Sequence, residues 1–197
     1  MTHPLRIDRV RLPDCAGEIG MTICPGKVDP YPLFPGPGWD RQLDVDLDLI
    51  RDQKASALVT LLENHEFRLL KVQDLGAEAE RRGMAWLHLP IIDGGAPDGK
   101  FETLWLSAGK MLHAELSCGR LIVLHCRGGL GRTGTVAARL LMERGVMVEE
   151  AIRRVRAARL GAIETTEQED YLRNLPSRVD FANIVQKLAA VAGQPPD

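Results

Sequence analysis

A short segment of the chain combines a cysteine, an arginine and three glycines: residues 125–133 read HCRGGLGRT. Glycines let successive backbone N–H groups turn inward and form a nest for an anion. Arg132 carries a planar guanidinium that can hold two oxygens of a phosphate-like group. Cys126 would lie in this positive field, which favours the nucleophilic thiolate. The segment therefore predicts a site that binds a phosphate group and attacks it.

The residues between and beside the cysteine and the arginine have predicted supporting roles. Thr133 is expected to donate a hydrogen bond to the cysteine sulfur, which would make the sulfur a better leaving group. The phosphate is expected to bind the backbone amides of the intervening loop, whose residues are Arg127, Gly128, Gly129, Leu130 and Gly131.

These residues need a strand before them and a helix after them. The apolar run at 121–124 predicts a strand that is buried on both faces. After the loop, an apolar stripe at helical spacing runs from Val136 to Leu141 and is closed by Gly145. This arrangement places Cys126 at the carboxyl end of a central strand and beneath a helix N-terminus, whose partial positive charge also favours an anion.

Phosphoryl transfer to a thiolate also needs an acid that protonates the departing oxygen. Residues 93–98 read DGGAPD, a glycine-rich loop with two carboxylates that could deliver such an acid. Asp98 directly precedes a strongly amphipathic helix that begins near Gly99, so its most economical role is the helix N-cap. Asp93 is therefore predicted to be the acid.

Three segments carry a resemblance to a known family. HCRGGLGRT resembles the HCxxGxxR(S/T) signature of cysteine-dependent tyrosine and dual-specificity phosphatases. PIIDGGAPD at 90–98 and GAIETTEQEDYL at 161–172 resemble the branch of the cyclin-dependent-kinase-associated phosphatase. The similarity runs from about residue 45 to about residue 175, with the motifs in the family's order.

The resemblance implies a phosphoprotein phosphatase that works without a metal or a cofactor. Such an enzyme hydrolyses phosphotyrosine and/or phosphoserine/threonine through a cysteinyl-phosphate intermediate. Asp93 stands where this branch has its acid. The resemblance also favours His125 as a residue that orders the phosphate loop and takes no part in proton transfer.

Two segments depart from the family pattern. The third segment usually begins with a glutamine that orients the hydrolytic water, but Glu164 stands there and only the second glutamine, Gln168, matches. Because a carboxylate close to bound phosphate is repelled, Glu164 is expected to point away from the site. Gln168 is then the predicted supporting residue. The commoner acid loop has tryptophan and proline before the aspartate, whereas Ile91 and Ile92 stand here.

Several alternatives remain open at this stage. Residues 129–134 also fit the GxGxxG pattern of dinucleotide-binding proteins, with Glu149 and Glu150 near the ribose-binding spacing, but the chain lacks the further strand–helix units of that fold. A phosphoprotein-binding pseudophosphatase is motivated by Glu164. The same chemistry could also act on a phosphoinositide, a nucleotide or an RNA end.

The pattern along the chain predicts one α/β domain of the dual-specificity-phosphatase type, with a central, mostly parallel sheet of four to five strands flanked by helices. Further strands are expected at 56–62 and 86–91, and helices at 43–52, 72–82 and 149–160. The loop at 63–66 is a candidate edge for substrate recognition. The predicted catalytic domain spans 39–176. It follows an extension, 1–38, with edge strands at 9–12 and 19–24 and a Pro/Gly-rich loop, and precedes a C-terminal helix and frayed tail, 177–197.

Composition limits the classes of function. The chain has 197 residues, 45% of them hydrophobic, which suits one compact core. A net charge of −2 gives no general attraction to nucleic acid or to anionic membranes, so neither is an expected partner. The four cysteines show no zinc spacing and fit free thiols in a reducing compartment. We expect a cytoplasmic monomer that acts on phosphorylated proteins.

Overall fold

A five-stranded sheet forms the centre of the protein, with strand order β1-β2-β7-β5-β6. The structure is a computed structural model that describes residues 3–29 and 38–175. Strand β1 is antiparallel to β2, and all the other neighbours are parallel. The strands are β1 (Asp8–Arg11), β2 (Glu18–Ile23), β5 (Ala55–Thr60), β6 (Ala85–His88) and β7 (Leu121–Cys126), with a separate small pair, β3 (Val28–Asp29) and β4 (Trp39–Asp40).

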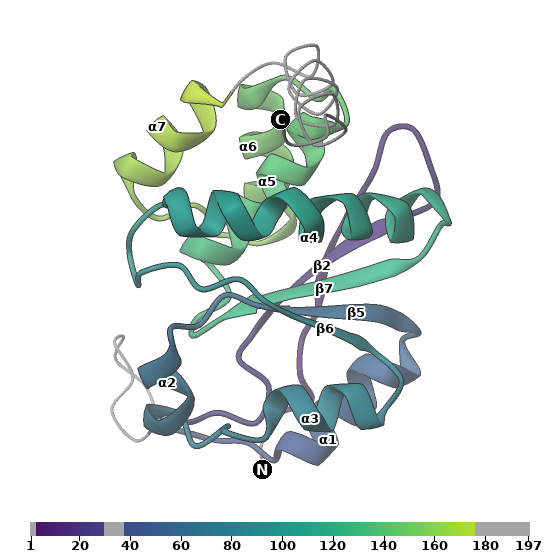
Figure 1. The fold of residues 1–197 in the computed structure, drawn as a ribbon, viewed down its shortest axis with the longest axis vertical. Coiled ribbons are helices and arrows are strands. Elements are labelled where there is room, and N and C mark those ends of the chain that lie inside the picture. The colour runs from purple at the N-terminus through teal and green to yellow at the C-terminus, as the bar shows by residue number, and fades with distance from the viewer. Residues whose placement is uncertain (1–2, 30–37, 176–197) are drawn as a thin grey trace, which may run out of the picture.

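Helices cover both faces of the sheet (Figure 1). Helices α1, α2 and α3 lie on one side, and α4, α5, α6 and α7 lie on the other. Their bounds are α1 (Leu43–Asp52), α2 (Asn64–Leu69), α3 (Leu75–Arg81), α4 (Gly99–Ser117), α5 (Gly131–Glu143), α6 (Val148–Ala158) and α7 (Thr166–Asn174). None of the helices in the described residues is long and apolar enough to cross a membrane.

Alternate residues of the central strand β7 enter two hydrophobic cores. Ile122 and Leu124 are fully buried in the core beneath α4 and α5, and Val123 is fully buried in the core shared with α1 and α3. This period of two is expected for a strand that is covered on both faces. Cys126 continues the first series, so its side chain lies on the α4–α5 side of the sheet.

The predicted fold class is confirmed, as are the central strand, the helix that follows it and the helix at 43–52. Two local predictions were wrong. Strand β2 is internal, not an edge strand, because it pairs with both β1 and β7 and buries Ile19 and Met21 completely. The expected recognition loop at 63–66 instead starts helix α2, because Glu63 and Glu66 form a reciprocal capping box at its N-terminus.

Some sequence-based predictions fall on residues that the structure does not describe. They include the C-terminal helix and tail at 177–197 and the candidate rim residues Tyr31 and Phe34. The domain boundaries given above stay predictions.

Candidate active site

Cys126 lies at the carboxyl end of β7, where the chain turns into the loop before α5. The residue is only 3% exposed. Its Sγ accepts a hydrogen bond from the backbone N–H of Gly129 at 3.2 Å. The predicted bond from Thr133 is not present, since the buried Thr133 Oγ1 has no hydrogen-bond partner among the described residues. The hydrogen bond to the sulfur therefore comes from the backbone of the loop and not from the threonine hydroxyl.

Residues 127–132, called the phosphate loop below, turn their first carbonyls outward. The Arg127 carbonyl accepts from Lys27 Nζ at 3.1 Å, and the Gly128 carbonyl accepts from Arg159 Nη2 at 3.1 Å. In a trans peptide the carbonyl and the following N–H point in opposite directions, so the N–H groups of Gly128 and Gly129 face inward. Two cations outside the loop thus help to hold the nest that the glycines predicted.

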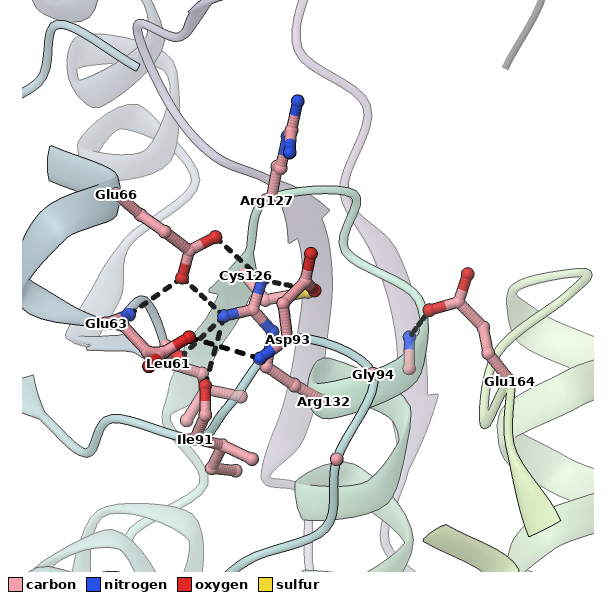
Figure 2. A network of polar contacts seen from close by, with 12 residues as sticks. Leu61, Glu63, Glu66, Ile91, Asp93, Gly94, Cys126, Arg127, Arg132 and Glu164 are labelled. Atoms are coloured by element: carbon pink, nitrogen blue, oxygen red, sulfur yellow. Dashed lines mark hydrogen bonds and ion pairs between the residues drawn. The ribbon is translucent and has the colours of Figure 1, made fainter. Parts of the chain in front are cut away.

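Arg132 is fixed from behind by carboxylates and carbonyls (Figure 2). Its Nη1 and Nη2 donate to the two oxygens of Glu66 at 2.6 and 2.9 Å, and Nη1 also approaches the Leu61 and Ile91 carbonyls. Burial lowers the pKa of the Arg132 guanidinium, but the hydrogen bonds that it donates to Glu66 and the nearby negative charges outweigh burial and raise the pKa above its usual value. The Nε atom has no partner among the described residues, so this edge can receive an oxygen of a ligand.

Asp93 reaches the same guanidinium from the other loop. Its Oδ1 lies 2.8 Å from Arg132 Nη2, and its side chain is 47% exposed. The backbone N–H of Asp93 donates to Glu63 Oε2 at 3.3 Å. The structure thus brings together the predicted nucleophile, phosphate-binding arginine and acid. Asp98 accepts from the N–H groups of Lys100 and Phe101, which confirms its assignment as the N-cap of α4.

Glu164 contradicts the expectation that it points away. Its Oε2 accepts from the N–H of Gly131 in the phosphate loop at 2.8 Å, on the opposite side of Cys126 from Glu66 in Figure 2. The N-terminus of α5 explains this contact, because its unpaired N–H groups and partial positive charge attract a carboxylate. Repulsion by bound phosphate therefore does not decide the position of Glu164 by itself, because the helix N-terminus attracts the carboxylate.

Gln168 is completely buried behind the phosphate loop. Its Oε1 accepts from the N–H of Glu164 at 2.9 Å and from that of Thr165 at 3.4 Å. Its Nε2 donates to the Gly95 carbonyl at 3.0 Å. The side chain is thus close to the site but is engaged by the backbone.

The side chain of Arg127 leaves the site, as Figure 2 shows. Its guanidinium pairs with Asp29 at 2.9 Å, so its charge is largely compensated. Lys27 is also nearly buried, and burial lowers the pKa of its ammonium group below the usual value. The positive charge that faces a ligand therefore comes mainly from Arg132 and the loop amides.

His125 is fully buried beneath the loop, with Nε2 2.8 Å from Thr60 Oγ1. Burial, with a smaller contribution from the nearby Arg132 charge, lowers its pKa to about 3. The imidazole is therefore neutral at physiological pH, which agrees with a role in ordering the loop and not in proton transfer.

Sequence reasoning missed the residues that hold the site in place. Glu66, Lys27 and Arg159 each contact the phosphate loop or its arginine from a distant segment. No local sequence pattern identifies these three residues as part of the site. A glutamate at the third position of a helix, as at Glu66, indicates only a capped helix start. No group of three or more His, Cys, Asp or Glu side chains in the described parts of the chain is arranged to hold a metal ion.

Comparison with known proteins places this geometry in a family. A family model described as "Polymorphic toxin system, DSP-PTPase phosphatase" matches residues 37–146. The chain is 36% identical over 88 residues to protein tyrosine phosphatase type IVA 3 of Homo sapiens, covering 45% of this chain and 50% of the relative. It is 30% identical over 135 residues to cyclin-dependent kinase inhibitor 3 of Rattus norvegicus, covering 67% and 62%. The matched regions thus span only about half to three fifths of these curated relatives.

Solved structures extend the similarity to almost the whole chain. The structure of kinase-associated phosphatase with its catalytic cysteine replaced by serine has a TM-score of 0.78 at 25% identity, covering 94% of this chain and 98% of that one. The active form of Tk-PTP has a TM-score of 0.63 at 28% identity, covering 89% and 97%. The chain therefore belongs to the DSP-PTPase family of cysteine-dependent phosphatases, in the branch that contains the kinase-associated phosphatase.

Proposed function

We propose that the protein is a phosphoprotein phosphatase that hydrolyses phosphotyrosine and/or phosphoserine/threonine through a cysteinyl-phosphate intermediate. The observation that carries the proposal is the position of Cys126 inside the phosphate loop, with the Gly129 N–H on its sulfur and Arg132 held beside it by Glu66. Backbone donors and one fixed guanidinium suit the charge that spreads over the oxygens of a transferring phosphoryl group.

In the first step, the Cys126 thiolate attacks phosphorus in line with the departing oxygen. A sulfur–phosphorus bond forms and the phosphorus–oxygen bond of the ester breaks. The inward amides of the loop and Arg132 hold the three equatorial oxygens. Asp93, in its protonated form, gives its proton to the leaving oxygen, so that an alcohol or a phenol departs.

In the second step, water hydrolyses the cysteinyl phosphate. Asp93, now a carboxylate, accepts a proton from the water as its oxygen bonds to phosphorus. The sulfur–phosphorus bond breaks, and inorganic phosphate and the Cys126 thiolate are regenerated. No step in this scheme uses a metal or a redox cofactor, since Arg132 and the backbone neutralise the charge.

The charge around the site supports a protein substrate over a polyanion. A phosphoinositide, a nucleotide or an RNA end would be favoured by further free cations, but Arg127 is paired with Asp29 and Lys27 is nearly buried. A phosphorylated side chain needs only the phosphate loop and Arg132. Since one relative is called a cyclin-dependent kinase inhibitor, a phosphorylated kinase is a reasonable first substrate. We further propose that the protein acts as a cytoplasmic monomer, with free thiols, without nucleic acid or membrane as partner.

Hydrolysis of a small aryl phosphate, measured across pH for the native protein and for Cys126→Ser, tests the chemistry. We expect turnover only in the native protein, unchanged by a metal chelator. Panels of phosphopeptides, phosphoinositides and nucleotides, compared by kcat/KM, then test the substrate class. Turnover that survives Cys126→Ser would contradict the mechanism.

The contact between Glu164 and the Gly131 N–H favours one second candidate, a phosphoprotein-binding pseudophosphatase. The carboxylate occupies a phosphate-loop amide that would otherwise stabilise the transferring phosphoryl group, while Arg132 and the other amides of the loop can still bind a phosphoprotein. Tight binding of phosphopeptides by a folded native protein with no turnover would establish this alternative. If the folded native protein showed neither phosphopeptide binding nor turnover, both candidate functions would be contradicted.

A further inference from the structure

The buried amide of Gln168 bridges the two loops on which the proposed reaction depends. On one side it packs against Gly131 of the phosphate loop, where a β-carbon would lie only 2.8 Å from Gln168 Nε2. On the other side Nε2 donates to the carbonyl of Gly95 at 3.0 Å. Gly95 lies two residues after Asp93, so one side chain links the nucleophile's loop to the acid's loop.

The start of α7 makes two more contacts with the acid loop, defined here as residues 93–97. Thr165 Oγ1 donates to the Gly94 carbonyl at 3.2 Å, and the Ala96 N–H donates to Glu167 Oε1 at 3.4 Å. Thr165 is itself oriented by Gln168, because these two residues form the reciprocal capping box at the N-terminus of α7. All three contacts therefore depend on the local structure that Gln168 completes.

Gln168 is poorly placed to hold a hydrolytic water. Its side chain is completely buried, and its oxygen already accepts from two backbone N–H groups. Its Nε2 donor is bonded to Gly95, and both Nε2 and Oε1 pack against Gly131 at the end of the phosphate loop. The carboxylate of Glu164, not the amide of Gln168, is the polar group of this segment that touches a phosphate-loop N–H.

We propose that Gln168 is a positioning residue for the acid: it fastens the acid loop to the phosphate loop and so places Asp93 next to Arg132. The proposal rests on the proposed function for its catalytic consequence. The loop is fastened at both ends, because the N–H of Asp93 donates to Glu63 and the carbonyls of Gly94 and Gly95 accept from the start of α7. A shift of about 1 Å in a reacting group costs roughly 100-fold in rate, so loss of one end should impair proton donation.

The dependence of kcat/KM on the leaving group tests the proposal. A set of aryl phosphates that runs from dinitrophenyl phosphate to phenyl phosphate differs in its need for an acid, because only a poor leaving group must be protonated as it departs. In Gln168→Met, a neutral change of similar length, we expect kcat/KM to fall by about 100-fold for phenyl phosphate and by less than about threefold for dinitrophenyl phosphate.

Two further variants separate positioning from folding. Gln168→Glu keeps the oxygen that accepts from the N–H groups of Glu164 and Thr165 but removes the donor to Gly95, so it should repeat the leaving-group effect. Asp170→Asn, a change at an exposed position of the same helix that contacts neither loop, should behave like the native protein. Circular dichroism checks that all variants are folded.

A double-mutant cycle with Asp93→Asn decides whether the effect passes through the acid. If Gln168 acts by placing Asp93, Gln168→Met should change kcat/KM for phenyl phosphate by less than about threefold in the Asp93→Asn background. An equal loss for every leaving group, or an undiminished loss in that background, would overturn the proposal.

Hydrogen exchange gives a result that does not depend on activity. We expect backbone amides in a peptide covering residues 92–97 to exchange faster in Gln168→Met than in the native protein, since the loop has lost its fastening. Absence of cysteine-dependent turnover would refute the proposed function alone. Unchanged exchange in this peptide would refute the link between the two loops, whatever the activity.

Discussion

Arg132 and Glu66 form a two-point ion pair inside the protein, with Nη–Oε distances of 2.6 and 2.9 Å and side chains that are 1% and 3% exposed. Glu66 lies on α2 and Arg132 lies on α5, 66 positions later in the sequence. The same Glu66 carboxylate accepts from the N–H of Glu63 at 2.7 Å and so also caps α2. One carboxylate therefore fixes both the start of a helix and the direction of the guanidinium.

The first prediction concerns removal of this carboxylate. Glu66→Ala removes the buried carboxylate that pairs with Arg132 and leaves the exposed Asp93 as the remaining ion-pair partner among the described residues. Breaking a buried pair in this way costs about 3–5 kcal/mol. We expect the free energy of unfolding to fall by that amount and kcat/KM for an aryl phosphate to fall about 100-fold, because Arg132 is no longer held. Urea denaturation and steady-state kinetics measure the two effects.

Glu150→Gln is the matched control for Glu66→Ala. Glu150 also pairs with two arginines, Arg153 and Arg154, but these pairs are on the surface. Solvent screens exposed pairs so that they contribute little to stability, and this variant should keep nearly native stability and full activity. Equal losses in the two variants would mean that burial of the Arg132 pair has no special importance.

The second prediction separates the two aspartates of the 93–98 segment. Asp93→Ala should lower kcat by about 10²–10⁴-fold, the usual contribution of a general acid, while a phosphopeptide still binds. Asp98→Ala should leave kcat almost unchanged and lower the free energy of unfolding by about 1 kcal/mol, because it removes the N-cap of α4. The reverse pattern would assign the acid to Asp98.

The sequence was sufficient to predict groups whose chemistry depends on local spacing. Cys126, the glycines and Arg132 are within seven consecutive residues, and a strand before a loop and a helix fixes their arrangement. The continuous apolar run at 121–124 likewise predicted a strand buried on both faces, and alternate residues of β7 do enter the two cores. Asp98 was separable from Asp93 because capping is a local property.

What the sequence did not predict depends on tertiary contacts. Glu66 reaches the site from helix α2 and Lys27 from the turn before β3. The residues next to them in the sequence do not indicate a partner more than sixty residues away. The placement of Glu164 was wrong for a related reason: the attraction of the Gly131 N–H at the start of α5 exists only once the two segments pack together. The hydrogen bond to the Cys126 sulfur, predicted from Thr133, is donated instead by the backbone N–H of Gly129, which the path of the loop places there.

The third prediction follows from the position of Glu164. Its carboxylate competes with phosphate oxygens for the phosphate loop and repels their charge, whereas Glu164→Gln keeps the acceptor and removes the charge. Two like charges about 4 Å apart in water repel by about 1 kcal/mol, so inhibition by inorganic phosphate should strengthen about fivefold or more in the variant. Competitive inhibition constants measure this effect. Asp170→Asn, an exposed change in the following helix, should leave the constant unaltered, and an unaltered constant in Glu164→Gln would contradict the prediction.

The fourth prediction compares two neighbouring glycines of the phosphate loop. Gly129 has a φ of +69°, and a β-carbon there would lie 2.2 Å from the Thr22 carbonyl oxygen of β2. Gly129→Ala should therefore lower the free energy of unfolding by more than about 2 kcal/mol, through left-handed backbone strain and overpacking. A β-carbon on Gly128 would meet nothing within 4 Å, so Gly128→Ala should stay folded. Thermal unfolding compares the pair, and equal stability would contradict the described path of the loop.

The fifth prediction concerns stability at low pH. The pKa of His125 falls from 6.5 to about 3 on folding, so between these values the unfolded chain binds a proton that the folded chain does not. The free energy of unfolding should then decrease as pH falls, with a contribution from His125 of about 1.4 kcal/mol per pH unit. Protonation of carboxylates whose pKa is lowered, such as Glu143, also decreases the free energy of unfolding as pH falls. This contribution is the same in all variants.

Comparison of variants isolates the contribution of His125 to the pH dependence of the free energy of unfolding. Between pH 6 and pH 4, urea denaturation of His125→Gln should show a slope that is smaller by about 1.4 kcal/mol per pH unit, because glutamine takes up no proton. His65→Gln, a change at an exposed histidine on α2, should keep the native slope. If His125→Gln also keeps the native slope, the imidazole takes up a proton in the folded protein, and the neutral, loop-ordering role assigned to it would be wrong.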